Sequence, residues 1–252
     1  MIHRKHIFTV AFALCIATTP GLFAATIAID THTTDRIVGI SQDTGTTALG
    51  YYANNTNNVV GVTGSSGSRT HHNIVFGYTL PTLAIGETLD AASFSFEIIA
   101  VRDHGTIGNL ADLDIYLLDT ANPDVTGDDF FLAASTDTSG NAELIGSTFP
   151  DPAPEDDTQV DYADDAYDLT FNLTGSALTL LQGYYTGNTP NQTEAFFRFN
   201  LNADTTIGND IDRYRIDVGA SESVLTLNTV PEPSTFALIG LAGLATLLRR
   251  RR

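Results

Sequence analysis

The chain has 252 residues, with 30 acidic and 12 basic side chains, and its formal net charge is −18 at pH 7. All 30 acids but only six arginines, and no lysine, lie between Asp30 and Glu232, which gives this region a formal charge of −24. Such an acidic surface repels phosphate backbones and argues against nucleic acid as a partner.

The first 25 residues predict a secretory signal peptide. A basic start precedes an apolar run of ten residues at 7–16, and small residues follow at the end of the stretch. This is the layout that the general secretion machinery recognises. Cys15 lies inside it, so the exported part has no cysteine and no disulfide framework. Its core alone must stabilise the fold.

Residues 26–229 predict an all-β body, because short alternating apolar runs recur between turn signals and long helical periodicity does not occur. A count of about ten to twelve short strands without a repeat period favours a single β-sandwich of jelly-roll type. In chain order, the expected strands are residues 26–30, 36–41, 59–62, 71–80, 91–101, 113–118, 130–134, 143–148, 169–173, 195–201, 214–218 and 223–228.

The clearest strand patterns also predict which side chains face the core. In the strand before Pro81, Ile74, Phe76 and Tyr78 fall on one face and Val75 falls on the other. In the strand that follows, one parity is apolar throughout and is expected to face inward. Its members are Ala92, Phe94, Phe96, Ile98 and Ala100.

Four segments are expected not to form long strands. Glycine, asparagine and serine in 43–69 predict turns with one short strand at most. A turn is expected over 83–90. The acidic, proline-punctuated residues 149–168 predict a loop. Apolar spacing in 176–185 fits one or two helical turns better than a strand.

No constellation of side chains singles out a catalytic site, so we expect a protein that is not an enzyme and has no cofactor. Carboxylates are plentiful, but no spacing marks an acid–base pair. The histidines lack the helical spacing of a zinc protease. His71 and His72 would point to opposite faces of a strand, which disfavours a shared metal.

A structural calcium ion is the one metal that the sequence suggests. Hard oxygen donors gather in the loop after the strand 113–118, although without the spacing of an EF-hand. The loop 151–168 is the alternative place for such an ion. The candidate ligands in the first loop are Asp119, Asp124, Asp128 and Asp129.

Tyrosine rings are the candidate sugar-binding side chains, because exposed aromatic faces stack on pyranose rings. The chain has no tryptophan, and the alternative is that these tyrosines belong to the core or its rim. The candidates are Tyr51, Tyr52, Tyr184 and Tyr185.

The last 23 residues have a three-part layout. A short rigid motif comes first, an apolar segment rich in small residues follows at 234–248, and four arginines end the chain. The 15 apolar residues would span roughly 22 Å as a helix, less than a bilayer core of about 30 Å. The arginines would stop transfer on the cytoplasmic side. The motif is Val230, Pro231, Glu232 and Pro233, and the stop-transfer cluster is Arg249, Arg250, Arg251 and Arg252.

This layout resembles the PEP-CTERM tail of bacterial surface proteins, which matches at each of residues 230–233 and continues with the helix and the arginines in the same order. The resemblance implies that a short transmembrane helix anchors the protein transiently in the inner membrane. It also implies that an exosortase, a membrane protease-transpeptidase, processes the tail. An ordinary membrane anchor is the alternative.

A second, looser resemblance covers about residues 30–228. The order of segments is similar to the DNRLRE-type domain of bacterial surface proteins, a jelly roll related to family 6 carbohydrate-binding modules. The features that carry it are Asp35-Arg36 before a Gly/Asn-rich stretch, Arg69 before residues 73–98, and the closing segments 169–173, 195–201 and 223–227. The tryptophans usual in that family are absent.

The sequence therefore predicts three parts: a signal peptide at 1–25, a β-sandwich body at 26–229 and a sorting tail at 230–252. The expected function is that of a non-catalytic protein of the cell surface or extracellular matrix, associated with exopolysaccharide or biofilm. The alternative is a carbohydrate-binding module for extracellular polysaccharide.

Overall fold

The computed structural model describes residues 24–41, 46–65, 68–102, 112–119, 141–148, 159–161, 167–202, 213–219 and 222–232. These residues form strands β1 to β15 and one helix, α1 (Gly175–Gly183). The strands are β1 (Ala25–Ile29), β2 (His32–Ser41), β3 (Thr46–Tyr52), β4 (Val59–Ser65), β5 (Ser68–Thr79), β6 (Glu87–Arg102), β7 (Asp112–Leu118), β8 (Ala142–Thr148), β9 (Gln159–Asp161), β10 (Tyr167–Asn172), β11 (Tyr185–Thr186), β12 (Thr189–Pro190), β13 (Glu194–Asn202), β14 (Arg213–Ile216) and β15 (Val224–Pro231).

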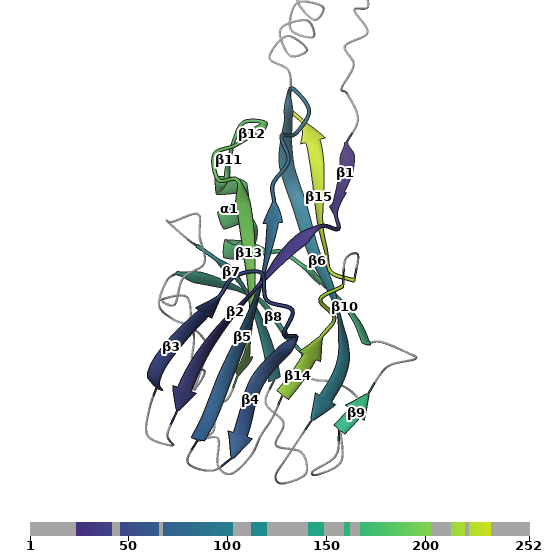
Figure 1. Ribbon diagram of the computed structural model, residues 1–252. Coiled ribbons are helices and arrows are strands. Elements are labelled where there is room, and N and C mark those ends of the chain that lie inside the picture. Colours follow the sequence, from purple (N-terminus) through teal and green to yellow (C-terminus); the bar gives the residue numbers. More distant parts are fainter. Residues whose placement is uncertain are drawn as a thin grey trace, which may run out of the picture.

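Thirteen of these strands join one antiparallel sheet in the order β1-β15-β6-β14-β4-β5-β13-β7-β8, with β2, β3, β9 and β10 attached beside this path. The long strand β6 is its spine, because β15 and β14 follow each other along one edge while β10 and β9 pair with the other. Figure 1 shows that the sheet curls. The all-β prediction is confirmed, but this curled, branched sheet does not establish the two-sheet jelly roll.

Two expected turns prove to be partly strand. Strand β3 lies in the Gly/Asn-rich stretch and pairs with β2 from Arg36↔Tyr52 to Ser41↔Thr46. Strand β6 begins at Glu87, inside the predicted turn 83–90. In both places backbone pairing with a neighbouring strand overrides the local turn signal.

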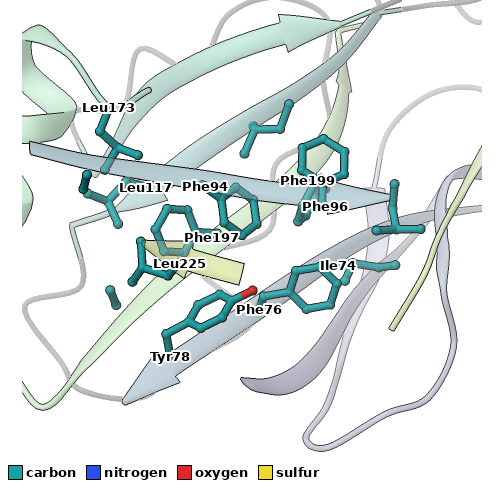
Figure 2. Packing of buried hydrophobic residues seen from close by; sticks show 14 of the residues in the cluster. Ile74, Phe76, Tyr78, Phe94, Phe96, Leu117, Leu173, Phe197, Phe199 and Leu225 are labelled. Carbon is teal, nitrogen blue, oxygen red and sulfur yellow. The ribbon is translucent and has the colours of Figure 1, made fainter. Parts of the chain in front are cut away.

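The main core lies on one face of the curled sheet, and its centre is aromatic (Figure 2). The rings of Phe94 and Phe197 are stacked with centroids 4.4 Å apart, and those of Phe96 and Phe199 meet edge to face at 4.8 Å. The predicted inward face of β6 is confirmed, since all five of its residues are buried. Each such ring buries a large apolar area and so contributes strongly to the stability of a body without disulfides.

A second buried face lies on the other side of β5, β13 and β7. Val75 belongs to it, as the alternation in β5 predicts, together with Tyr116 and Phe196. Asp114 and Arg198 are also buried there, with 0% and 3% of their surfaces exposed. The sequence pattern of β7 predicts one inward face, whereas the structure buries every residue of this strand after Asp112.

The two ends of the described chain leave the sheet side by side. Strand β15 lies between β1 and β6 and pairs with β1 from Ala25↔Thr229 to Ile29↔Leu225. Within the part of the chain that the structure describes, no helix has the length and apolar character to cross a membrane. The predicted helix of the tail, 234–248, and all but the last two residues of the predicted signal peptide lie outside the described residues.

Candidate functional sites

The motif of residues 230–233 begins inside the sheet. Val230 pairs with Thr88 and Pro231 pairs with Glu87 at the end of β15. The Glu232 N–H then donates a hydrogen bond to the Gly86 carbonyl at 2.6 Å. The body therefore reaches the motif without a linker, two residues beyond the predicted boundary at 229.

A proline is tolerated in this strand because Pro231 and Glu87 form a non-hydrogen-bonded pair, as the bond from the Glu232 N–H to the Gly86 carbonyl shows. No ladder bond therefore requires an N–H at Pro231, and the N–H of Glu87 donates to the Ala84 carbonyl at 3.0 Å. The Glu87 side chain is buried, with 4% of its surface exposed, and accepts a hydrogen bond from the Thr229 hydroxyl at 2.7 Å. These contacts fix the first half of the motif on the body. Pro233 and the four arginines lie outside the described residues.

A hollow of about 230 Å³ opens between β2, β13 and the end of β3. Asp35 lines it and is a buried residue with 7% of its surface exposed. The Tyr51 hydroxyl donates to Asp35 Oδ2 at 3.1 Å, and the Asn54 N–H donates to Oδ1 at 2.8 Å. The lining residues are Thr33, Asp35, Tyr51, Ala53, Asn54, Glu194 and Phe196.

Two backbone features shape this hollow. Asn54 has a positive φ of 51°, which asparagine tolerates better than most residues, and it closes the turn after β3. Gly77 lies beneath the hollow where three strands approach closely. A Cβ on Gly77 would lie 2.6 Å from the Thr33 hydroxyl and 2.8 Å from the Phe196 ring, so this position requires glycine.

The four candidate tyrosines separate into an exposed pair and a packed pair. Tyr51 and Tyr52 are 40% and 45% exposed, and Tyr51 lines the hollow. The Arg36 guanidinium lies over the Tyr52 ring at 4.6 Å, so Tyr52 belongs to a different contact. Tyr51 is therefore the candidate that the structure places beside carboxylates.

The hydroxyls of Tyr184 and Tyr185 both donate hydrogen bonds to backbone carbonyls of other segments. Tyr184 is 4% exposed, and its hydroxyl donates to the Leu118 carbonyl at 2.6 Å. The Tyr185 hydroxyl donates to the Pro81 carbonyl at 3.2 Å, and burial raises the pKa of Tyr185 to about 12. In this structure the pair links α1 and its hairpin to neighbouring strands and presents no common ring face.

Of the four candidate calcium ligands, the structure describes Asp119 alone. Asp119 is exposed just after β7, and its N–H donates to the Asn141 carbonyl at 2.8 Å. Asp124, Asp128 and Asp129 lie outside the described residues. Among the residues that the structure describes, no three acidic, histidine or cysteine side chains gather in a way that would hold a metal ion.

One acidic group and one histidine have strongly altered ionisation. Burial, together with a hydrogen bond from its side chain to that of Glu222 and the nearby charge of Asp168, raises the pKa of Glu97 to about 7. Burial and the nearby charges of Arg36 and His71 lower the pKa of His72 to about 4. His72 is thus neutral at pH 7, and its Nε2 lies 2.8 Å from the Thr63 hydroxyl.

Sequence reasoning missed Asp35, Asn54 and Glu194 as a group. The three residues come from different parts of the chain, and β2, the turn after β3 and β13 bring them together only through long-range pairing. The sequence offered one partial signal, a carboxylate at position 35 directly before the expected strand 36–41; the structure extends this strand to His32–Ser41 and so includes Asp35.

Comparison with known proteins identifies the end of the chain. The model of the PEP-CTERM protein-sorting motif matches residues 229–252. The resemblance of the tail is thereby confirmed, and the motif implies exosortase-dependent sorting to the cell surface. A search of curated proteins found no match to this chain.

Proposed function

We propose that the chain is an exported, non-catalytic protein of the cell surface or extracellular matrix that stays with the exopolysaccharide of a biofilm. The general secretion machinery exports it, the apolar segment 234–248 anchors it transiently in the inner membrane, and an exosortase-type enzyme processes the tail. The observation that supports this proposal is the sorting motif at residues 229–252, joined directly to the last strand of an acidic all-β body.

The surface-located form is expected to lack Arg249–Arg252, because processing at the motif removes everything that follows it. Intact-mass measurement of protein released from the cell surface checks this. A matched variant with alanine at Pro231, Glu232 and Pro233 is expected to keep the arginines and to stay in the membrane fraction. Finding the four arginines on the wild-type surface form would refute processing.

A second candidate function is carbohydrate binding at the hollow of Tyr51. The exposed ring of Tyr51 offers a stacking face, and the carboxylates of Asp35 and Glu194 are acceptors for sugar hydroxyls. Two carboxylates disfavour uronic acids and sulfated sugars, so the ligand class is neutral or amino-bearing polysaccharide. We include in this second proposal that the body is a jelly roll related to carbohydrate-binding modules.

Affinity electrophoresis in gels containing the organism's own exopolysaccharide tests the second function. The wild-type protein is expected to be retarded and Tyr51→Ala to migrate freely. Tyr51→Phe keeps the ring and loses the hydrogen bond to Asp35, so partial retardation is expected. Tyr52→Ala is the control, because Tyr52 lies under Arg36 outside the hollow. An unretarded wild type, or equal loss in Tyr52→Ala, would dispose of this assignment.

A further inference from the structure

Two long stretches of the body contain no charged side chain. Residues 73–86 and 169–193 contain no acidic or basic side chain, although the region between Asp30 and Glu232 carries a formal charge of −24. The ends of these stretches, 80–86 and 184–193, are joined to each other and are here called the neutral pole.

Hydrogen bonds hold the neutral pole together. The Leu80 N–H donates to the Thr193 carbonyl at 2.8 Å, and the Leu83 N–H donates to the Asn188 carbonyl at 2.8 Å. The Asn188 side chain donates back to the Leu83 carbonyl at 3.2 Å. The pole is therefore a built part of the fold, formed by the turn between β5 and β6 and the hairpin β11–β12.

Both ends of the body leave the sheet at the neutral pole. The Glu232 N–H donates to the carbonyl of Gly86 in the turn itself. Ala25, the first residue of β1, pairs with Thr229 near the end of β15. Figure 1 shows the turn before β6, the end of β15 and the start of β1 at the same end of the molecule.

The tip of the pole exposes a large apolar side chain. Ile85, next to Gly86, is 91% exposed. The apolar segment of the tail begins at residue 234, two residues after Glu232, and two residues extend at most about 7 Å. When that segment is inserted in a bilayer, Ile85 must lie within a short distance of the lipid surface.

We propose that the neutral pole is a membrane-docking surface, which rests on the lipid headgroups with Ile85 inserted among them while the tail is anchored. This inference rests on the proposed function, because it requires the tail to be in the membrane. The acidic remainder of the body is repelled by anionic headgroups, whereas the pole carries no charge to be repelled. The exposed acids Asp90 and Glu232 border the pole and limit how deeply it can sink.

Site-specific fluorescence on the full chain tests this docking. In a Cys15→Ser background, single cysteines at Ile85 and Thr189 report on the pole, and a cysteine at Asp112 reports on the far end of the sheet. Asp112 pairs with Asn202, eight residues along β13 from Glu194, or about 26 Å away. Each variant carries an environment-sensitive dye in vesicles of phosphatidylethanolamine and phosphatidylglycerol with a headgroup spin-labelled quencher.

The expected result is a blue shift and strong quenching at positions 85 and 189, with neither at position 112. Ile85→Asp is expected to abolish quenching at 189, while Ile85→Val retains it; both keep the fold, because the side chain is exposed. Flotation of the vesicles reports separately on tail insertion. Protein that floats without quenching at 85 overturns the docking alone, whereas protein that does not float overturns the docking together with the membrane step of the proposed function.

Discussion

Replacing Phe94 with alanine is expected to lower the free energy of unfolding of the body by about 3–5 kcal/mol. Phe94 is fully buried, and its ring centroid lies 4.4 Å from that of Phe197 and 5.6 Å from that of Phe96. Removal of the ring leaves a cavity whose walls are other rings on rigid strands, so the site collapses poorly. Urea denaturation of residues 24–232 measures the loss.

Ile85→Ala is the matched control for this substitution. Its side chain is 91% exposed, so the same experiment is expected to show a change within about 0.5 kcal/mol. The free energy of unfolding of an ordinary domain is roughly 5–15 kcal/mol. The loss expected for Phe94→Ala is therefore a large fraction of the total stability. Equal losses in the two variants would show that the aromatic cluster does not determine the stability of the body.

Replacing Asp114 with alanine is expected to lower the free energy of unfolding by about 3 kcal/mol. Its carboxylate is fully buried and accepts hydrogen bonds from the Tyr116 and Ser147 hydroxyls. The substitution removes this acceptor from both hydroxyls. It also removes a negative charge from a face that buries the Arg198 guanidinium, whose Cζ lies 5.0 Å from the Tyr116 ring centroid.

Asp112→Ala on the same strand is the control, since Asp112 is exposed at the start of β7. It is expected to change the unfolding free energy by less than about 0.5 kcal/mol. Asp114→Asn keeps an acceptor oxygen and is expected to fall between the two alanine variants. If Asp114→Ala unfolds at the same urea concentration as Asp112→Ala, the buried polar face contributes nothing to stability.

The strands with one buried face could be predicted from the sequence, because alternation reports burial directly. This holds for β6, where Phe94 and Phe96 face the core. In β5 the alternation also places Val75 and Phe76 on opposite faces, although the structure buries both faces of that strand. The helix predicted at 176–185 was found as α1 at Gly175–Gly183. Local pattern suffices wherever the sheet covers one side of the element.

Features that depend on long-range pairing could not be predicted. Strand β3 has a turn-like composition and forms because β2 lies beside it. Tyr184 and Tyr51 each belong to a Tyr-Tyr pair after a glycine, yet Tyr184 is buried with its hydroxyl bonded to the Leu118 carbonyl, whereas Tyr51 lines the hollow. The polar residues of β7 are buried because both faces of this strand are covered, which alternation within one strand does not reveal.

The pairing of the first strand with the last determines when the fold can be completed. Strand β15 pairs with β1 on one side and with residues 87–95 of β6 on the other. Neither of these two strand edges can form its backbone hydrogen bonds before β15 is present. A chain that crosses the membrane from its N-terminus delivers β15 after every other strand, so these edges stay open until translocation reaches residue 231. Pairing across nearly the whole chain is slow to form, and open edges aggregate. The last strand to pair in such a chain is thus the strand that carries the start of the sorting motif.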